Sequence, residues 1–592
     1  MNNSLLRIDL SKEEINIEDL SDDLLENYLG GRGLGVKLLC DNLEKGVDPL
    51  SPANILIFSI GPLTGTIAPT SGRSALVTKS PLTNTILHSN SGGFWGVGLK
   101  RCGFDALYIT GRLNQRGYIV IDGSSVEIKE AEELWGLSTE ETLEKVRNIE
   151  GNCQILSIGP AGENLVRIAA IMNQAQRAFG RGGVGAVMGS KGLKAIVVKK
   201  GNKKFQQNLE QMKMLNQVAS DKIKVFPVTS QGLPLFGTAV LIKVINAFGM
   251  LPVNNNQMAY IADTRVDEIS GESLRERFLE KAEGCYGCPI RCGRLTNTGE
   301  MRGKGPEFES LWALGPQCGI FDLKTITHAN YFCNRYGLDT ISVGGTIACA
   351  MELQQRGLLE DSTIRFGNSD ILCDIIRKIA YKEGIGEYLA EGALRFAERY
   401  QGIEYAMQVK GLELPAYDPR GAMGQALNFA TSNRGACHLT GYLVGMELLG
   451  VPKLIDRFSL AKSDLLVLKQ NQSAVEDSLV VCKFVGFALG LDYQVRFLKS
   501  ITGQDYTIDK LVEIGERIYT LERLFNIREG FSRKDDTLPE RFLKESLEEG
   551  PSKGYVVPLE KLLEDYYRIR RWDENGVPTD EVLQKLNLER LN

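Results

Sequence analysis

The run Ala195-Ile196-Val197-Val198 marks the point at which the hydrophobic pattern of the sequence changes. It is the last of several short β-branched or aliphatic runs separated by turn residues, a pattern typical of strands. After Lys204 the apolar residues recur at helical spacing instead. We therefore predict an α+β fold in which a β-rich domain precedes a mainly helical region. The other predicted strands are residues 55–60, 74–77, 105–109 and 118–121.

The helical region divides at a segment rich in Gly and Pro, residues 410–421. We expect three domains, with a β-rich base over residues 1–205 and helical domains over 206–415 and 416–592. The predicted helices are residues 209–222, 274–281, 325–336, 371–381, 388–400, 511–525 and 559–571.

Composition excludes several classes of protein. The 592 residues carry 69 basic and 74 acidic side chains, a net charge of −5, and 43% are hydrophobic. These values fit neither a disordered chain nor a strongly basic nucleic-acid binder. No uninterrupted apolar run reaches the roughly 20 residues of a membrane helix, since Lys483 interrupts residues 480–491, and the N-terminus lacks the pattern of a secretory signal. We predict a cytoplasmic protein without a membrane span.

Three of the twelve cysteines form the most informative local motif, Cys285-x2-Cys288-x3-Cys292, on a predicted loop after a helix. Three thiolates at this spacing suit one face of a cubane iron–sulfur cluster, whose fourth iron needs a ligand from elsewhere. A structural zinc site is the alternative. With only three histidines, a His-rich metal centre is disfavoured. Taken alone, Cys482 is expected to be a packing residue, like the remaining cysteines 40, 102, 153, 318, 333, 349, 373 and 437.

Glycine-rich segments suggest phosphate binding without a dinucleotide fold. Residues 180–185 match G-x-G-x-x-G, but we expect a helix over 169–179 before them and a strand over 193–198 after them, which is the wrong context for NAD. Residues 30–35 and 89–96 can offer backbone N–H groups to phosphate, and the alternative is that they are turns of a glycine-rich sheet. The candidate phosphate clamps are Arg73, Arg177 and Arg181.

Taken together, these segments resemble the aldehyde ferredoxin oxidoreductase family of tungsten-pterin enzymes, over nearly the whole chain. The resemblance rests on ordered matches at residues 30–35, 69–73, 89–93, 177–191, the cysteine triplet, 305–309, 337–340, 415–421 and 432–439.

The resemblance implies a β-rich base that carries two molybdopterins in pseudo-twofold relation, with one tungsten or molybdenum between them and two helical domains closing over them. It implies that Asn90 and Ala178 hold a Mg²⁺ ion through their carbonyl oxygens. The base residues that it assigns to the pterin phosphates are Arg73, Asn90, Gly92, Arg177, Ala178, Gly180 and Arg181.

The resemblance also implies two pterin-gripping loops of the pattern D-x-x-G-L-D, here residues 334–339 and 477–482. The second loop ends in Cys482, which becomes the fourth ligand of a 4Fe-4S cluster. The first begins with Asn334, whose amide cannot form a charge-assisted pair with the pterin, so we expect weaker binding there. The expected cofactor contacts of the helical domains are Asn334, Leu338, Asp339, Arg434, Asp477 and Val481.

The implied reaction is oxidation of a small aldehyde with water to a carboxylic acid, with electrons passing through the cluster to ferredoxin or another low-potential carrier. Glu309 is expected to handle the proton and His438 to hydrogen-bond the carbonyl oxygen, with Glu307 a nearby decoy. The alternatives are a tungsten-dependent reductase of an acid or activated aromatic ring in the same superfamily, and a zinc-site scaffold protein. A homodimer or an electron-transfer complex is possible.

Overall fold

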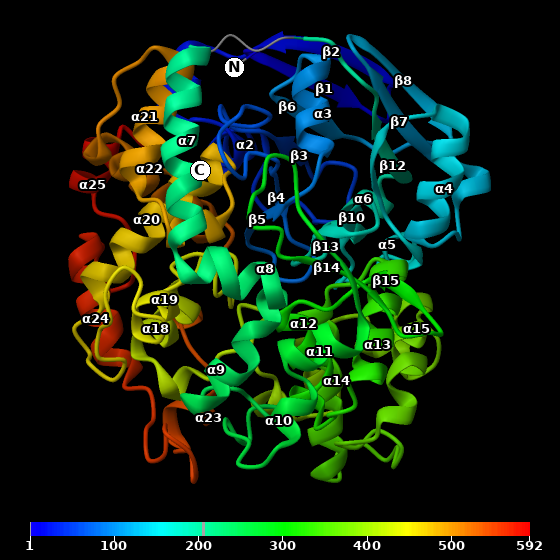
Figure 1. Ribbon diagram of the computed structural model, residues 1–592, viewed down its shortest axis with the longest axis vertical. Helices are drawn as coiled ribbons and strands as arrows, with labels where there is room; N and C mark the ends of the chain where they lie inside the picture. Colours follow the sequence, from blue (N-terminus) through cyan, green and yellow to red (C-terminus); the bar gives the residue numbers. More distant parts are fainter. Residues whose placement is uncertain (1, 204–207, 592) are drawn as a thin grey trace.

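A computed structural model describes residues 2–203 and 208–591, and its first 200 residues form two six-stranded sheets (Figure 1). The first sheet contains β1 (Ser4–Asp9), β2 (Glu14–Asp19), β3 (Leu56–Ser59), β4 (Ser74–Lys79), β5 (Ile86–Ser91) and β6 (Ala106–Thr110). The second contains β7 (Gly117–Asp122), β8 (Ser125–Glu130), β9 (Gln154–Ser157), β10 (Ile171–Asn173), β11 (Arg177–Phe179) and β12 (Leu193–Val198).

The two sheets have the same topology. The first has the strand order β2-β1-β6-β3-β4-β5, and the second has β8-β7-β12-β9-β10-β11. In each, one parallel pair, β1 with β6 or β7 with β12, lies among antiparallel neighbours. Their inner faces share one apolar core that includes Phe58, Trp95 and Ile196. The base is therefore a duplicated unit, which gives it the approximate twofold character that the resemblance implied.

Helices make up most of the remaining chain and lie below and to the left of the sheets (Figure 1). One apolar core includes residues on both sides of residue 415, from Ala239 to Trp572, together with a few residues of the base such as Leu82 and Ile168. A second core joins the first sheet to α2 (Gly31–Asn42), α20 (Ser463–Leu479) and α22 (Ile508–Arg528). The α+β prediction is confirmed. The domain boundary near 415 stays a prediction, and the one at 205 lies outside the described residues.

Three local predictions were wrong. Residues 169–179 form β10 and β11 rather than a helix, because alternate side chains there pack into the core between the sheets. Residues 279–283 form the strand β13 (Leu279–Glu283) after α11 (Gly271–Phe278). The helix predicted over 388–400 is divided between α16 (Ile385–Leu389) and α17 (Ala393–Arg399), because Gly392 between them has a φ of +87°.

One helical run, Val228–Ala247, is long and apolar enough to cross a membrane, judged by length and composition only. Its mean hydropathy is 1.4 and 33% of it is buried. The run is a chain of short pieces that includes α8 (Leu233–Phe236) and α9 (Leu241–Ala247), interrupted by Gly237 at a φ of +64°. A core helix of a soluble protein passes the same test. The sequence pattern did not predict this run, because its apolar stretches are separated by polar residues.

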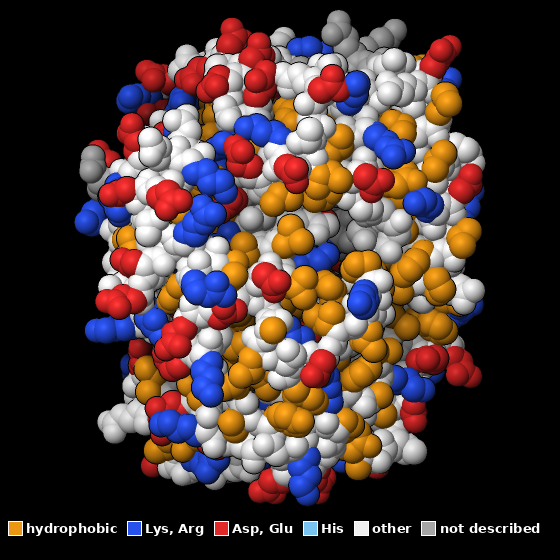
Figure 2. All heavy atoms as spheres, turned by 90° about the vertical axis from the view of Figure 1, so that its left-hand side faces the viewer, with side chains coloured by type: hydrophobic (Ala, Val, Ile, Leu, Met, Phe, Trp, Pro, Cys, Tyr) orange, Lys and Arg blue, Asp and Glu red, His pale blue; other side chains and the backbone are white. Residues whose placement is uncertain are grey.

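One side of the molecule, the left-hand side of Figure 1, carries acidic and basic side chains intermingled (Figure 2). Hydrophobic side chains gather toward the centre and lower right of this face, around a hollow. No single sign of charge dominates this face, in agreement with the small net charge of the chain.

Two helices end directly against glycines of the base. The helix α20 ends at Leu479, and a Cβ added to Gly61 would lie 2.3 Å from the Leu479 carbonyl oxygen. The helix α13 (Leu323–Tyr336) ends at Tyr336, and a Cβ on Gly159 would lie 2.4 Å from the Tyr336 carbonyl oxygen. Gly61 and Gly159 occupy matching positions, each two residues after the equivalent strand β3 or β9. The absence of a side chain lets the helix backbones approach this closely.

The chain leaves both helices in the same way. The residue after α13 is Gly337, at a φ of +73°, and the residue after α20 is Val480, at a φ of +57°. This left-handed cap is common at helix ends, but it is unfavourable for a β-branched residue such as valine. Residues 334–339 and 477–482 are therefore structurally equivalent loops, each placed by a helix end on one half of the duplicated base.

We predict that Gly61→Ala lowers the free energy of unfolding by about 1–3 kcal/mol, because its methyl group would overlap the Leu479 carbonyl oxygen. The matched control is Gly232→Ala, whose methyl group would have its nearest neighbour 3.9 Å away and should not destabilise the protein. Urea unfolding of the three proteins measures the difference. Equal stability of Gly61→Ala and the wild type would contradict the importance of this close approach.

Candidate functional site

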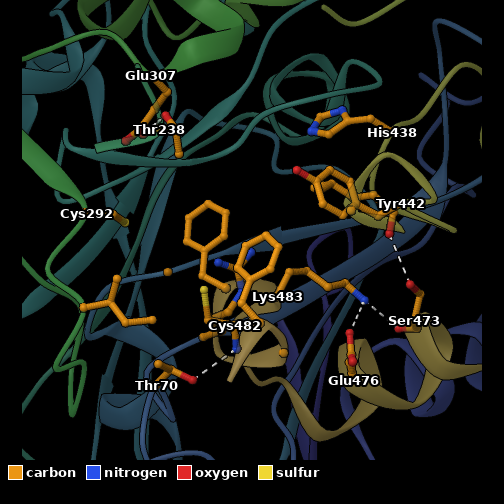
Figure 3. Close-up of a pocket in the computed structure, with 18 of the residues that line it drawn as sticks. Thr70, Thr238, Cys292, Glu307, His438, Tyr442, Ser473, Glu476, Cys482 and Lys483 are labelled. Atoms are coloured by element: carbon orange, nitrogen blue, oxygen red, sulfur yellow. Dashed lines mark hydrogen bonds and ion pairs between the residues drawn. The ribbon is translucent and has the colours of Figure 1, made fainter. Parts of the chain in front are cut away.

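A cavity of about 320 Å³ lies between the base and the helical region. Figure 3 shows Cys292 and Glu307 on one side of it, His438 and Tyr442 on the other, and Cys482 below. The predicted site residues that line the cavity are Arg73, Gly92, Arg177, Cys285, Cys288, Cys292, Glu309, His438 and Cys482. The structure thus brings all four predicted cluster ligands and both predicted catalytic residues to one cavity.

The cysteine triplet lies on a loop between β13 and β14 (Gly293–Asn297), pressed against glycines of the base. A Cβ on Gly92 would lie 2.7 Å from Cys285 Sγ, and one on Gly72 would lie 2.8 Å from the Tyr286 Cβ. The Tyr286 N–H donates to the Gly93 carbonyl at 3.2 Å. The glycine-rich base segment therefore cradles the cysteine loop through its backbone.

Thr70 connects the triplet to the fourth cysteine. Its N–H donates to the Gly287 carbonyl at 3.0 Å, and its hydroxyl accepts the Cys482 N–H at 3.4 Å (Figure 3). Thr70 is buried at a φ of +61°, an unfavourable conformation for a β-branched residue. Among the described residues no group of three or more His, Cys, Asp or Glu side chains is close enough to hold a single metal ion. All four cysteines nevertheless line the same cavity.

Glu309 and His438 form a pair inside the cavity. Glu309 lies in the first turn of α12 (Phe308–Leu314), and its Oε1 is 3.5 Å from His438 Nε2. Its other oxygen accepts the Ala416 N–H at 2.9 Å. Burial raises the pKa of Glu309 to about 8, although Ala416 and Arg181 favour the anion. Burial, with Arg181 and Arg434 nearby, lowers the pKa of His438 to about 3. At neutral pH both groups are uncharged.

Glu307 has the opposite electrostatic environment. Its Oε1 is 2.5 Å from Lys304 Nζ and 3.5 Å from Arg177 Nη1, and its Oε2 accepts the Thr238 hydroxyl at 2.6 Å. Burial alone would raise the pKa of Glu307, but the two cations outweigh burial and hold it at about 2. Glu307 is therefore a fixed anion at the N-cap position of α12, while Glu309 can exchange a proton near neutral pH.

Asp477 is held by a network of buried ion pairs. Arg32 is completely buried, donates two hydrogen bonds of 2.7 Å to Glu522 and lies 3.4 Å from Asp477 Oδ2. The Asn90 amide donates to Asp477 Oδ1 at 2.8 Å, and Lys483 Nζ is 3.3 Å from the same oxygen. Although burial opposes it, Lys483 and Arg32 lower the pKa of Asp477. Arg32 belongs to the glycine-rich residues 30–35, which the sequence suggested as a phosphate-binding segment. In the structure its guanidinium pairs with Glu522 and Asp477 of the helical region.

Asp339 is held by a second arginine of the base. Arg181 Nε donates to Asp339 Oδ2 at 3.2 Å, and its two terminal nitrogens donate to the Ala436 and Glu413 carbonyls at 2.8 and 2.6 Å. Asp339 also caps α14 (Thr340–Gln355) by accepting the Ile341 N–H. Each nitrogen of Arg181 therefore has a protein partner, and the structure places Arg181 as a link between domains.

The remaining predicted cofactor residues surround the cavity without lining it. The Asn90 carbonyl accepts an N–H of Arg73 at 3.2 Å, and Ala178 lies in β11. Asn334 Nδ2 donates weakly to the Lys304 carbonyl, at 3.4 Å. The residues in this group are Asn90, Ala178, Gly180, Arg181, Asn334, Leu338, Asp339, Arg434, Asp477 and Val481.

Several cavity residues were missed by the sequence reasoning. The cavity wall includes the aromatic side chains of Tyr417, Tyr442, Phe484 and Phe487. Tyr417 lies within the quoted run 415–421, but aromatic residues in helical segments resemble ordinary core residues. Cys437, expected only to pack, accepts an Arg434 N–H at 2.7 Å, and despite its burial this arginine lowers the pKa of its thiol.

Unpartnered polar atoms indicate that the site has hydrogen-bonding groups available for a further group. The buried atoms without a hydrogen-bond partner include Asn90 Oδ1, Arg434 Nε, Glu309 Oε1 and His438 Nδ1. A Cβ on Gly180 would meet no atom within 4 Å. Because buried polar groups are normally satisfied, these atoms fit a polar ligand such as a pterin cofactor.

Comparison with known proteins establishes the family. The family models described as "Aldehyde ferredoxin oxidoreductase, N-terminal domain" and "Aldehyde ferredoxin oxidoreductase, domains 2 & 3" match residues 5–200 and 214–588. The chain belongs to the aldehyde ferredoxin oxidoreductase family. It is 45% identical to the tungsten-containing aldehyde ferredoxin oxidoreductase of Pyrococcus horikoshii, covering 99% of this chain and 98% of that one. As a member of this family, the chain is an oxidoreductase.

Two more distant relatives share the whole length of the chain. The aliphatic sulfonate oxidoreductase, WOR-like subunit, of Pyrococcus furiosus is 32% identical, covering 99% of this chain and 97% of that one. The solved structure of the active site complex BamBC of benzoyl coenzyme A reductase in complex with 1,5 dienoyl-CoA is 25% identical with a TM-score of 0.86, covering 99% and 97%. Because the chain belongs to the aldehyde ferredoxin oxidoreductase family, we no longer consider the alternative that it is a zinc-site scaffold protein.

We predict that Glu309 is protonated in the metal-free protein at pH 7 and ionises as the pH rises through about 8. Infrared difference spectra between wild type and Glu309→Gln should show one protonated-carboxyl band at pH 7. This band should disappear as the pH rises above about 8. The subtraction removes other buried carboxyls, such as Glu413, that are present in both proteins. An ionised Glu309 at pH 6 would contradict the prediction.

Proposed function

We propose that this protein oxidises a small aldehyde with water to a carboxylic acid and passes the two electrons to a ferredoxin. The aldehyde gains the water oxygen, its C–H bond is broken, and two protons and two electrons leave for each turnover. The observation that carries the proposal is the Glu309 and His438 pair, 3.5 Å apart in the cavity that four cysteines also line. The similarity to aldehyde ferredoxin oxidoreductases at 45% identity supports the same reaction.

The residues around the cavity fit a tungsten bis-pterin cofactor with a bridging Mg²⁺. Asn90 Oδ1 and Arg434 Nε are buried and unpartnered, and the space beside Gly180 is open. Arg73, Gly92 and Arg177 line the cavity, while Asn334, Leu338, Asp339, Asp477 and Val481 lie on the two equivalent loops. When bound, the cofactor would accept the two electrons of the aldehyde oxidation.

The chain's own residues would manage the protons. The ionised form of Glu309 would take a proton from water or from the tetrahedral carbon centre, and a pKa of about 8 keeps that form accessible near neutral pH. Neutral His438 would donate a hydrogen bond to the carbonyl oxygen, where negative charge develops. Glu307 cannot share this work, because Lys304 and Arg177 hold it as an anion.

The four cysteines would hold a 4Fe-4S cluster that carries electrons away from the cavity. Cys285, Cys288, Cys292 and Cys482 are all half-buried, while seven of the eight other cysteines are buried. A cubane attaches its cysteine ligands at separate corners, which suits four cysteines that line one cavity. Thr70 would support the cluster by bridging both ligand segments through hydrogen bonds.

A reductase reaction is the second candidate, favoured by the structural similarity to the benzoyl coenzyme A reductase complex. The higher identity to aldehyde ferredoxin oxidoreductases makes aldehyde oxidation the better-supported reaction. An anaerobic assay of the purified protein distinguishes the two, with a panel of aldehydes and a low-potential dye against an aromatic thioester and a reductant. The cytoplasmic location and a homodimer or electron-transfer complex stay predictions.

We predict that Glu309→Gln lowers turnover by about 10²–10⁴-fold, because it removes the proton acceptor while keeping a similar shape. Tungsten and iron contents should match the wild type. The control is Glu404→Gln, which changes an exposed carboxylate outside the cavity and should leave turnover unchanged. Unchanged turnover in Glu309→Gln with full metal content would remove Glu309 from the mechanism.

We predict that Cys482→Ser lowers iron per chain and abolishes electron transfer to ferredoxin, because one corner of the cluster loses its thiolate. The control is Cys373→Ser, a half-buried cysteine that does not line the cavity and should keep its iron. Metal analysis and electron paramagnetic resonance of the reduced proteins measure the outcome. Full iron content with normal ferredoxin reduction in Cys482→Ser would exclude Cys482 as a ligand.

A further inference from the structure

A second, smaller hollow lies on the surface beside the cysteine loop. It has a volume of about 210 Å³, and its lining residues include Phe94, Arg101, Lys200 and Tyr286. We call these four residues the docking face. Phe94 exposes 44% of its surface, and its ring meets the Tyr286 ring edge-on at 6.3 Å. The Arg101 guanidinium lies 5.7 Å from the centre of the Tyr286 ring. The exposed Phe94 ring, the half-buried Tyr286 ring and the adjacent arginine are residue types that are enriched in protein interaction sites.

The docking face is positively charged on a protein that is negative overall. Arg101 and Lys200 have no ion pair with any described residue, whereas the neighbouring Lys199 is paired with Glu150 at 2.9 Å. The exposed Arg291 adds a further cation on the cysteine loop. Since the whole chain carries a net charge of −5, this local excess of positive charge favours an acidic partner.

The docking face adjoins the cysteine loop. Tyr286 follows Cys285 in the chain, and another surface hollow is lined by Cys285, Cys288 and Arg291. The catalytic pair lies on the inner side of the same loop, in the cavity shared with Cys292 and Cys482. A partner seated on Tyr286 and Phe94 therefore lies beside the cysteine loop, one residue along the chain from Cys285, without blocking Glu309.

We propose that Phe94, Arg101, Lys200 and Tyr286 form the docking surface for the protein electron acceptor, a small acidic iron–sulfur protein. This inference rests on the proposed function, since it names where the acceptor of that reaction binds. The acceptor's carboxylates would face Arg101 and Lys200, and an apolar patch around its cluster would cover Phe94 and Tyr286. One electron at a time would pass from the cysteine site to that cluster, with no bond made or broken.

The experiment measures aldehyde oxidation by the anaerobically purified holoenzyme with two acceptors, a purified acidic ferredoxin and methyl viologen. For Arg101→Glu/Lys200→Glu we expect the KM for ferredoxin to rise about tenfold at low salt, because reversing rim charges weakens electrostatic encounter. The rise should shrink at about 0.2 M salt, where exposed charges are screened. Turnover with methyl viologen should stay within about twofold of the wild type, because a small dye does not need the surface.

Two further variants make the result specific. Lys200→Glu alone changes an exposed side chain and should give a smaller rise of the same kind, even if the double variant folds poorly. The matched control is Lys553→Glu/Lys561→Glu, an equal charge change at exposed positions on α24 (Leu559–Arg570) and the loop before it, far from α3 (Trp95–Cys102) in Figure 1. It should leave the ferredoxin KM unchanged.

The possible outcomes separate this inference from the proposed function. An unchanged ferredoxin KM in Lys200→Glu and in the double variant, with normal dye reduction, would overturn the docking face. If the control Lys553→Glu/Lys561→Glu raised the ferredoxin KM as much as Arg101→Glu/Lys200→Glu, the docking face would also be overturned. The KM would then depend only on the net charge of the protein. If the wild-type holoenzyme reduces methyl viologen with none of the aldehydes, the proposed reaction is wrong. Calorimetric titration of the same variants with ferredoxin then still tests whether the docking face binds it.

Discussion

The close contact of two helix ends with two glycines is the constraint on which the rest of the structure depends. Leu479 and Tyr336 end their helices against Gly61 and Gly159, at matching positions of a duplicated base. A short loop follows each helix, and Cys482 at the end of the second loop lines the cavity. A side chain at either glycine would push the helix away, and the loop would lose its position over the base. The proposed cofactor site, which combines residues from distant parts of the chain, depends on this contact.

Electrostatics assigns different roles to charged groups of the same type. The buried Asp477 and the half-buried Glu307 lie beside cations and remain anions, so they act as structural anchors. Glu309 is buried without a close cation, so its pKa rises to about 8 and it can exchange a proton. His438 is kept neutral by its burial and by Arg181 and Arg434. The separation of these pKa values is a property of the folded environment and cannot be derived from the residue types.

The fold class, the cysteine triplet and the glycine-rich segments could be predicted from local patterns, because periodicity and spacing are local properties. The link between Cys482 and the triplet could not, because it depends on Thr70 bridging two remote segments. The duplication of the base left only a faint trace, the repeated Ser-Ile-Gly-Pro at residues 59–62 and 157–160. Residues 169–179 were mistaken for a helix because short strands separated by a tight turn imitate helical spacing. Arg181 stays a predicted phosphate ligand, and no local pattern indicated its protein partners Asp339, Glu413 and Ala436, which lie far away in the chain.

The central claim is that electrons taken from an aldehyde beside Glu309 reach a cluster held by Cys285, Cys288, Cys292 and Cys482. The most direct test adds an aldehyde to the anaerobic, oxidised holoenzyme without any acceptor and follows the cluster by electron paramagnetic resonance. The account predicts that a reduced 4Fe-4S signal appears within a single turnover. A cluster that dithionite reduces but that no aldehyde reduces would contradict it.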